Sequence, residues 1–172
     1  MSETRFGIAG LGDVPHLALL IEKAYRGEDA ARGWTNEAAL LTGPRSSSLE
    51  VEALVRDPDS RFVTAMRDGR LVGCALIQLK GDHAHFGMFA IDPDHQGNGL
   101  GRQLIAAAED SARTLWGCAS MRLAVISLRD ELIAWYERRG FVRTGEREPF
   151  PFETATGAMR RDFDLVVLSK PL

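Results

Sequence analysis

The sequence predicts a single α/β domain in which helices flank a mixed, mostly antiparallel sheet. Its length of 172 residues suits one domain rather than two, because single domains commonly hold ~100–200 residues. Its composition, with 45% hydrophobic and 26% charged residues, is typical of a chain that folds around a core. Segments with helical periodicity alternate with segments rich in β-branched and aliphatic residues. We therefore expect one domain over residues 1–172.

Helices are predicted where apolar residues recur every three or four positions and a capping signal bounds the segment. Asp13 is a suitable N-cap for the first helix. Pro58 ends the second, because a proline disfavours helical backbone in the residue before it. Ser127 and Asp130 have the spacing of a capping box, and Gly140 stands where a left-handed C-cap is expected. The predicted helices cover residues 14–25, 49–56, 100–115 and 128–139.

Strands are predicted where apolar runs are bounded by turn signals. The pair Asp68-Gly69 is the commonest two-residue hairpin signal, and Gly81-Asp82 separates the next two runs, so three strands should form an antiparallel meander. Residues 26–48 are the least regular segment, and only 37–41 look helical within it. The predicted strands cover residues 5–10, 61–67, 70–80, 83–91, 121–126, 141–147 and 161–168.

The charge balance and the cysteine content disfavour several classes of function. Twenty-one Lys and Arg residues against 24 Asp and Glu give a net charge of -3, which does not favour binding to nucleic acid. Cys74 and Cys118 are too few for a disulfide framework or a zinc cluster, and we expect both to pack in the core. The chain opens without a signal peptide and contains no run of about 18 apolar residues. We therefore expect a cytoplasmic protein, not bound to a membrane and without a metal.

The strongest local signal joins the strand that ends at Ile91 to the helix that begins at Leu100. The intervening segment, residues 96–101, reads Gln-Gly-Asn-Gly-Leu-Gly. Glycines let the backbone turn sharply and bring its N–H groups close to an anion, and the helix start adds unpaired donors and a positive dipole end. The segment lacks the Gly-Lys-Ser/Thr ending of a P-loop and the third glycine of a dinucleotide fingerprint. Another phosphate or pyrophosphate ligand is therefore expected.

This segment resembles the acetyl-CoA-binding signature of GNAT-type N-acetyltransferases, Gln/Arg-x-x-Gly-x-Gly/Ala, which is matched here by Gln96, Gly99 and Gly101. A second block of that family is matched downstream by Leu123, Val125, Tyr136, Gly140 and Phe141. The order of the predicted elements over residues 5–168 is also similar to that family's fold. The resemblance implies the GNAT-like acyl-CoA N-acyltransferase fold and acetyl-CoA as the co-substrate.

The resemblance also implies where the co-substrate binds. The strands around residues 91 and 125 would splay to admit the pantetheine arm, whose amides can extend a sheet edge as a peptide does. Arg102 either reaches a CoA phosphate or points into solvent. Arg129 replaces a frequent asparagine of the family, and it either approaches a phosphate or an acidic substrate or is an ordinary exposed arginine. The implied binding residues are Met88, Phe89, Ile91, Gln96, Gly97, Asn98, Gly99, Gly101, Arg102 and Arg129.

Two residues are candidates for the chemistry. Tyr136 stands where the family often has a tyrosine that protonates the departing thiolate, and a phenol with a pKa near ~10 can donate as a thiolate with a pKa near ~8.5 forms. His85 falls near the position of a glutamate base in many relatives, and histidine titrates near ~6.5. The alternatives are that Tyr136 is a core aromatic residue and that His85 and the nearby His83 have no catalytic part.

Tyr25, Trp34 and Phe150 fall where the family builds its acceptor pocket, and they could select substrates. Phe150 and Phe152 could instead cover a sheet edge or a dimer interface. We predict direct acetyl transfer to a primary amine of a small molecule. The alternatives are a protein N-terminal or lysine acetyltransferase and a non-catalytic acetyl-CoA-binding or sensing module. The sequence leaves open the acceptor, the length of the acyl group, the base and whether a homodimer forms.

Overall fold

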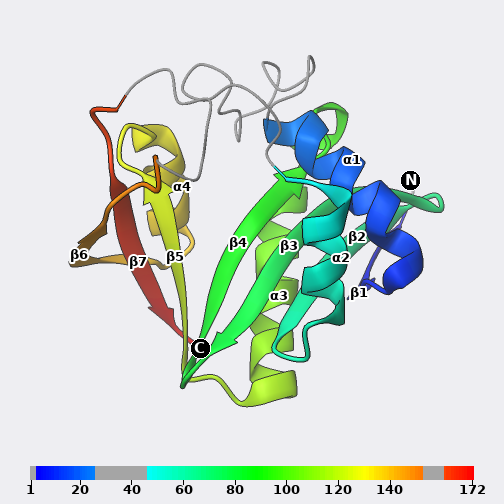
Figure 1. Ribbon diagram of the computed structural model, residues 1–172, viewed down its shortest axis with the longest axis horizontal. Helices are drawn as coiled ribbons and strands as arrows, with labels where there is room; N and C mark the ends of the chain where they lie inside the picture. Colours follow the sequence, from blue (N-terminus) through cyan, green and yellow to red (C-terminus); the bar gives the residue numbers. More distant parts are fainter. Residues whose placement is uncertain (1–2, 26–45, 153–160) are drawn as a thin grey trace.

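The computed structural model describes residues 3–25, 46–152 and 161–172. Within these ranges one sheet is covered by helices on both faces (Figure 1). The strands are β1 (Thr4–Ile8), β2 (Ser60–Arg67), β3 (Arg70–Lys80), β4 (His83–Ile91), β5 (Ser120–Ile126), β6 (Val142–Glu148) and β7 (Leu165–Pro171). The helices are α1 (Val14–Tyr25), α2 (Ser48–Arg56), α3 (Leu100–Trp116) and α4 (Asp130–Arg138). The predicted fold class is confirmed.

The sheet has the strand order β1-β2-β3-β4-β5-β7-β6, in which β4 and β5 are parallel and the other neighbours are antiparallel. The predicted hairpin between β2 and β3 is present. Asp68 and Gly69 have φ angles of 52° and 73°, as a type I′ turn requires at both central positions. The local turn signals therefore fix the order of the first strands.

The two faces of the sheet carry separate hydrophobic clusters. Helices α1 and α2 pack on one face, where Leu17 and Ile21 bury against Phe62. Helices α3 and α4 pack on the other face, where Leu104 and Ile133 join the inward side chains of the central strands. Apolar residues at three- and four-residue spacing give each helix one buried stripe, and this burial is the main force that docks it on the sheet.

The parallel strands β4 and β5 meet at one end and then diverge (Figure 1). Their described residues pair at His83↔Ser120, Ala84↔Met121 and His85↔Arg122. Just beyond this pairing, β4 contains a β-bulge. Gly87 pairs with Leu76 and Ala90 pairs with Cys74, so β4 has one more residue than β3 between these two pairs. Met88 lies inside the bulge with a φ of 43°, a strained conformation for a residue with a side chain. The predicted splay is therefore present and coincides with an irregular stretch of β4.

Two predicted helix caps are wrong. The Asp13 carboxylate accepts a hydrogen bond from the backbone N–H of Gly10 at 2.8 Å, because a short 3-10 helix, Leu11–Asp13, precedes α1. Ser127 Oγ accepts a hydrogen bond from the backbone N–H of Asp164 at 3.1 Å, and α4 begins only at Asp130. In both cases a polar side chain with capping chemistry finds another backbone donor.

The last strand is shifted from its predicted position. We expect a strand over residues 161–168, but β7 runs from Leu165 to Pro171, because it pairs with the whole of β5 from Ile126 back to Ser120. Phe163 lies before the strand and is buried against Phe150 and Phe152. The predicted helical stretch at 37–41 lies outside the described residues.

Both cysteines are buried free thiols, as predicted. Burial raises the pKa of Cys74 to about 12, so its reactive thiolate form is scarce at neutral pH. Across the part of the chain that the structure describes, no helix is both long and apolar enough to cross a membrane.

Candidate functional site

The loop after β4, the first turn of α3 and one face of α4 line a half-open cavity of about 500 Å³. Most of the residues predicted to bind the co-substrate line it, namely Ile91, Gln96, Gly97, Gly99, Gly101, Arg102 and Arg129. The other lining residues belong to α4 and its C-terminal cap and are Glu131, Leu132, Trp135, Arg138 and Arg139. Of the remaining predicted binding residues, Met88 and Phe89 are buried in β4 and Asn98 is exposed on the loop.

The glycines shape the loop where it enters α3. Gly97 and Gly99 have φ angles of 87° and 84°, in the region that favours glycine over residues with a Cβ atom. Gly99 is the N-cap of α3, and its carbonyl accepts the first helical hydrogen bond, from the N–H of Gln103 at 3.1 Å. The first turn of an α-helix has backbone N–H groups without intrahelical partners, so the cavity meets a natural anion-binding position.

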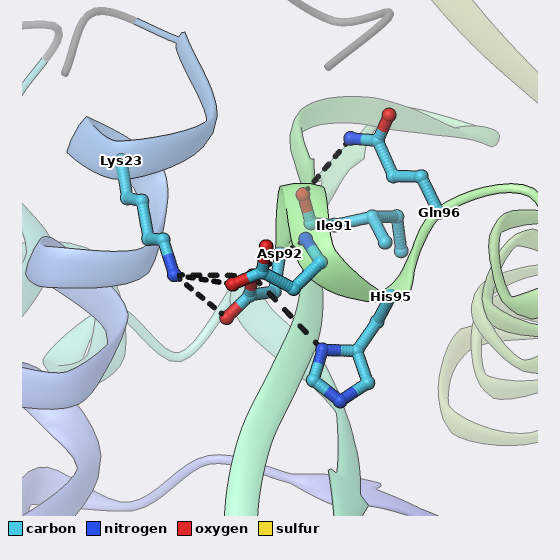
Figure 2. Close-up of polar contacts among 6 residues, drawn as sticks. Lys23, Ile91, Asp92, His95 and Gln96 are labelled. Carbon is cyan, nitrogen blue, oxygen red and sulfur yellow. Dashed lines mark hydrogen bonds and ion pairs between the residues drawn. The ribbon is translucent and has the colours of Figure 1, made fainter. Parts of the chain in front are cut away.

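Gln96 fixes the loop to the end of β4. Its side-chain Nε2 donates a hydrogen bond to the carbonyl of Ile91 at 3.1 Å (Figure 2). The side chain of this signature residue is therefore oriented toward the protein backbone. Its contribution to the site includes holding the turn between Ile91 and Gly97 in place.

Positive charge dominates the cavity wall. Arg102 comes from α3, whereas Arg129, Arg138 and Arg139 come from the two ends of α4. Guanidinium groups suit phosphate oxygens because they offer several N–H donors in a fixed plane. The Arg139 guanidinium carbon lies 5.1 Å from the centre of the Trp135 ring. The cavity thus offers both cationic and apolar surface.

Apart from Arg129 at its N-cap, sequence reasoning missed the contribution of α4 to this cavity. Leu132, Trp135 and Arg139 follow one another at three- and four-residue steps and therefore share one face of the helix. The adjacent Arg138-Arg139 pair before Gly140 is a visible basic signal. What the sequence does not reveal is that this face lies opposite the glycine loop.

Tyr136 is buried in an aromatic cluster that includes Trp135, a residue of the cavity wall. It is 5% exposed, and its ring centre lies 6.3 Å from that of Phe86, 6.4 Å from that of Phe89 and 5.8 Å from that of Phe141. Burial raises the pKa of Tyr136 well above 10, and Tyr25 adds to this while Arg129 opposes it. The phenol is therefore a neutral donor across the physiological range.

His85 lies on β4 just before the bulge and faces away from Tyr136. Side chains alternate along a strand, and Phe86 packs with Tyr136, so His85 points to the opposite face of the sheet. Its Nε2 lies 3.8 Å from where a Cβ atom on Gly87 would be. Burial lowers the pKa of His85 below 6.5, although Glu148 opposes this shift. At neutral pH its imidazole is uncharged and can accept a proton.

The candidate acceptor residues divide between the two sides of the split. The Tyr25 hydroxyl donates to the carbonyl of Phe89 in β4 at 2.6 Å. Phe150 packs with Phe152 and Phe163 against Ile126, the last residue of β5. Trp34 lies outside the described residues.

The sequence relationship identifies the chain as an acyl-CoA-dependent N-acetyltransferase. The sequence profile of the acetyltransferase (GNAT) family matches residues 19–141, and the chain belongs to this family. The predicted family is therefore confirmed.

Several known proteins are similar to this chain. The N-alpha-acetyltransferase RimI of Mycobacterium tuberculosis is 32% identical over 145 residues, which cover 78% of this chain and 87% of that protein. The IAA acetyltransferase of Azospirillum brasilense is 31% identical over 104 residues, 59% of this chain and 67% of that protein. The ribosomal-protein-S18-alanine N-acetyltransferase of Escherichia coli has the same fold, with a TM-score of 0.73, 20% identity and coverage of 98% and 94% of the two chains.

Proposed function

We propose that the protein transfers an acetyl group from acetyl-CoA to the primary amine of a small molecule by direct attack. The observation that carries this proposal is that the arginine-lined cavity and the bulge of β4 both adjoin Ile91, at the open end of the split. One extended ligand can therefore place its phosphates in the cavity and its thioester beside the bulge.

The phosphate end is bound by the glycine loop and by the arginines. Backbone N–H groups from Gln96 to Gly101 meet the diphosphate, with Arg102 and Arg129 supplying counter-charge. The pantetheine arm then runs along Met88 to Ile91 in β4, where the lost pairing with β5 leaves room for a chain of amides. Trp135 provides apolar contact surface on the cavity wall.

The chemistry needs a neutral amine beside the thioester carbonyl. His85, uncharged at neutral pH, takes a proton from the incoming ammonium group through water, and the amine nitrogen then attacks the carbonyl carbon. A backbone N–H near Phe89 or Ile91 stabilises the oxyanion that forms. Collapse of the tetrahedral intermediate breaks the C–S bond, and Tyr136 donates its proton to the thiolate. The nitrogen gives up its second proton through water to the Tyr136 phenolate, which restores the phenol. The products are an N-acetyl amide and CoA.

The described residues around His85 and the split support a small cationic amine as the acceptor. Tyr25 and Phe150, both half-buried, supply aromatic surface on the two sides. Among the charged neighbours of His85, the Glu148 carboxylate acts to raise its pKa more than the Lys80 cation acts to lower it, although burial lowers the pKa overall, so an approaching ammonium group meets a carboxylate there. Aromatic walls with one acidic group suit a small cationic amine.

A peptide α-amine is the second candidate, favoured by the 32% identity to an N-alpha-acetyltransferase. A thiol-release assay with acetyl-CoA separates the two. We expect release with at least one of the amino acids, polyamines and aminoglycosides, and little with peptides that carry a free N-terminus. Release with peptides alone would support the second candidate. Binding of acetyl-CoA without release by any acceptor, together with unchanged behaviour of Tyr136→Phe, would instead support a binding or sensing module.

A further inference from the structure

The last turn of α1 contacts the end of β4 at two separate points. Lys23 Nζ lies 3.2 Å from both carboxylate oxygens of Asp92 and 3.5 Å from one oxygen of Asp94 (Figure 2). Tyr25, two residues further on, donates its hydroxyl hydrogen to the Phe89 carbonyl at 2.6 Å. The two contacts lie on either side of Ile91.

Asp92 organises the turn that leads into the glycine loop. Its backbone N–H donates to the Val72 carbonyl at 2.9 Å, and its carboxylate accepts from the N–H of Asp94 at 3.0 Å. Its own carbonyl accepts from the N–H of His95 at 2.8 Å. The side chain of Asp92 is 16% exposed, so the nearby ammonium group of Lys23 offsets a carboxylate that water reaches poorly. Lys23 therefore contacts the residue that shapes the loop.

The position of Lys23 is set by the core. Leu17, Ile21 and Ala24 of α1 are fully buried, and they belong to the same cluster as Met88 and Ala90 of β4. The helix is therefore docked on the bulge by apolar packing. The hydrogen bonds from Lys23 and Tyr25 fix how the last turn of the helix is oriented against the end of β4.

We propose that the last turn of α1 positions both ends of the acyl-CoA site. Lys23 positions the diphosphate loop through its contact with Asp92, and Tyr25 positions the β4 bulge through its hydrogen bond to the Phe89 carbonyl. The roles differ because Asp92 and Asp94 directly precede the loop. Without Lys23, both carboxylates would lose a neighbouring positive charge beside a bound diphosphate, and the turn would lose one of its contacts. Without the Tyr25 hydroxyl, the peptide group beside the thioester would lose the hydrogen bond that orients it.

This inference rests on the proposed function, and truncated donors test it. S-acetyl-pantetheine has the thioester and the amide arm of acetyl-CoA but lacks the diphosphate. Lys23→Met is expected to raise the KM for acetyl-CoA about tenfold, with kcat within about twofold, and to leave kcat/KM for S-acetyl-pantetheine unchanged. Lys23→Arg should keep the KM close to that of the wild type. Tyr25→Phe should lower kcat about tenfold with both donors.

Arg56→Met is the matched control, because it removes an exposed cation from a surface ion pair with Glu52 on α2. It should alter neither donor's kinetics. Thermal melting checks that each variant is folded, and Lys23→Gln is a second uncharged variant if Lys23→Met unfolds. An equal change of kcat/KM with both donors for the uncharged variants Lys23→Met and Lys23→Gln, or no change with either donor, would overturn the inference. If the wild type itself fails to release thiol from acetyl-CoA with any acceptor, the proposed function fails instead.

Discussion

Gly99→Glu tests the phosphate-binding role of the glycine loop. A Cβ atom on Gly99 would meet one neighbouring group within 4 Å, the Arg102 guanidinium at 3.8 Å, so a side chain has space there. The φ of 84° makes any non-glycine residue strained, at a cost of about 1–2 kcal/mol to folding. The new carboxylate would stand at the N-cap of α3, where the diphosphate is proposed to bind.

Repulsion between the new carboxylate and one phosphate charge at about 5 Å amounts to about 3 kcal/mol at an effective dielectric constant of about 20. Since 1.4 kcal/mol corresponds to about a tenfold change in affinity, the Kd for CoA should rise at least a hundredfold. The introduced carboxylate would also compete with the phosphates for Arg102, which acts in the same direction.

The matched control is Gly99→Gln, which has the same shape and the same backbone strain without the charge. Isothermal titration calorimetry with CoA should find a loss of about tenfold or less for Gly99→Gln and a far larger loss for Gly99→Glu. The gap between the two should narrow as salt is added, because ions screen exposed charges. Equal affinities of the two variants would refute the assignment of the loop to a phosphate.

Three further predictions concern catalysis, pH and stability. Tyr136→Phe should lower kcat about a hundredfold and leave the KM for acetyl-CoA within about twofold, and unchanged steady-state kinetics would contradict the acid role. The pKa of His85 is lowered by burial, so kcat/KM should fall as the pH drops through a value below 6.5, and His85→Asn should abolish this acid limb. Because the pKa of His85 is lower in the folded protein, the unfolded chain binds a proton at this position more readily than the folded chain does. The free energy of unfolding of the wild type should therefore decline as the pH falls below 6.5, and that of His85→Asn should decline less. Lys170→Met should lower the free energy of unfolding in urea by about 3 kcal/mol, because the carboxylate of Glu109 is 6% exposed and would lose the ammonium group that lies 2.7 Å away. The double variant Glu109→Gln with Lys170→Met should lose less stability than Lys170→Met alone, which would confirm that the two side chains are coupled.

The sequence predicted the elements whose signals are local. The turn signals Asp68-Gly69 and Gly81-Asp82, with the apolar runs that they bound, placed β3 and β4 at their observed bounds, since these signals depend only on near neighbours in the chain. The glycine spacing likewise placed the loop at the start of α3. The family resemblance predicted that β4 and β5 splay apart, whereas composition and periodicity give no signal for this feature.

The features that the sequence did not reveal depend on distant partners. Ser127 has the chemistry of a helix cap, but its hydroxyl oxygen instead accepts a hydrogen bond from the backbone N–H of Asp164, 37 residues away. The contact between Lys23 and Asp92 joins residues 69 positions apart, and that between Tyr25 and Phe89 joins residues 64 positions apart. Patterns of near neighbours in the sequence therefore predict neither contact. The strained φ of Met88 arises from the bulge in the register with β3 and has no signal in the residue type.

A crystal structure of the protein with CoA bound tests the central claim most directly. The account predicts the diphosphate within hydrogen-bond distance of the backbone N–H groups between Gln96 and Gly101, and the pantetheine arm between β4 and β5 beside Phe89. A complex in which CoA occupies another surface while this loop and the split stay empty would contradict the account.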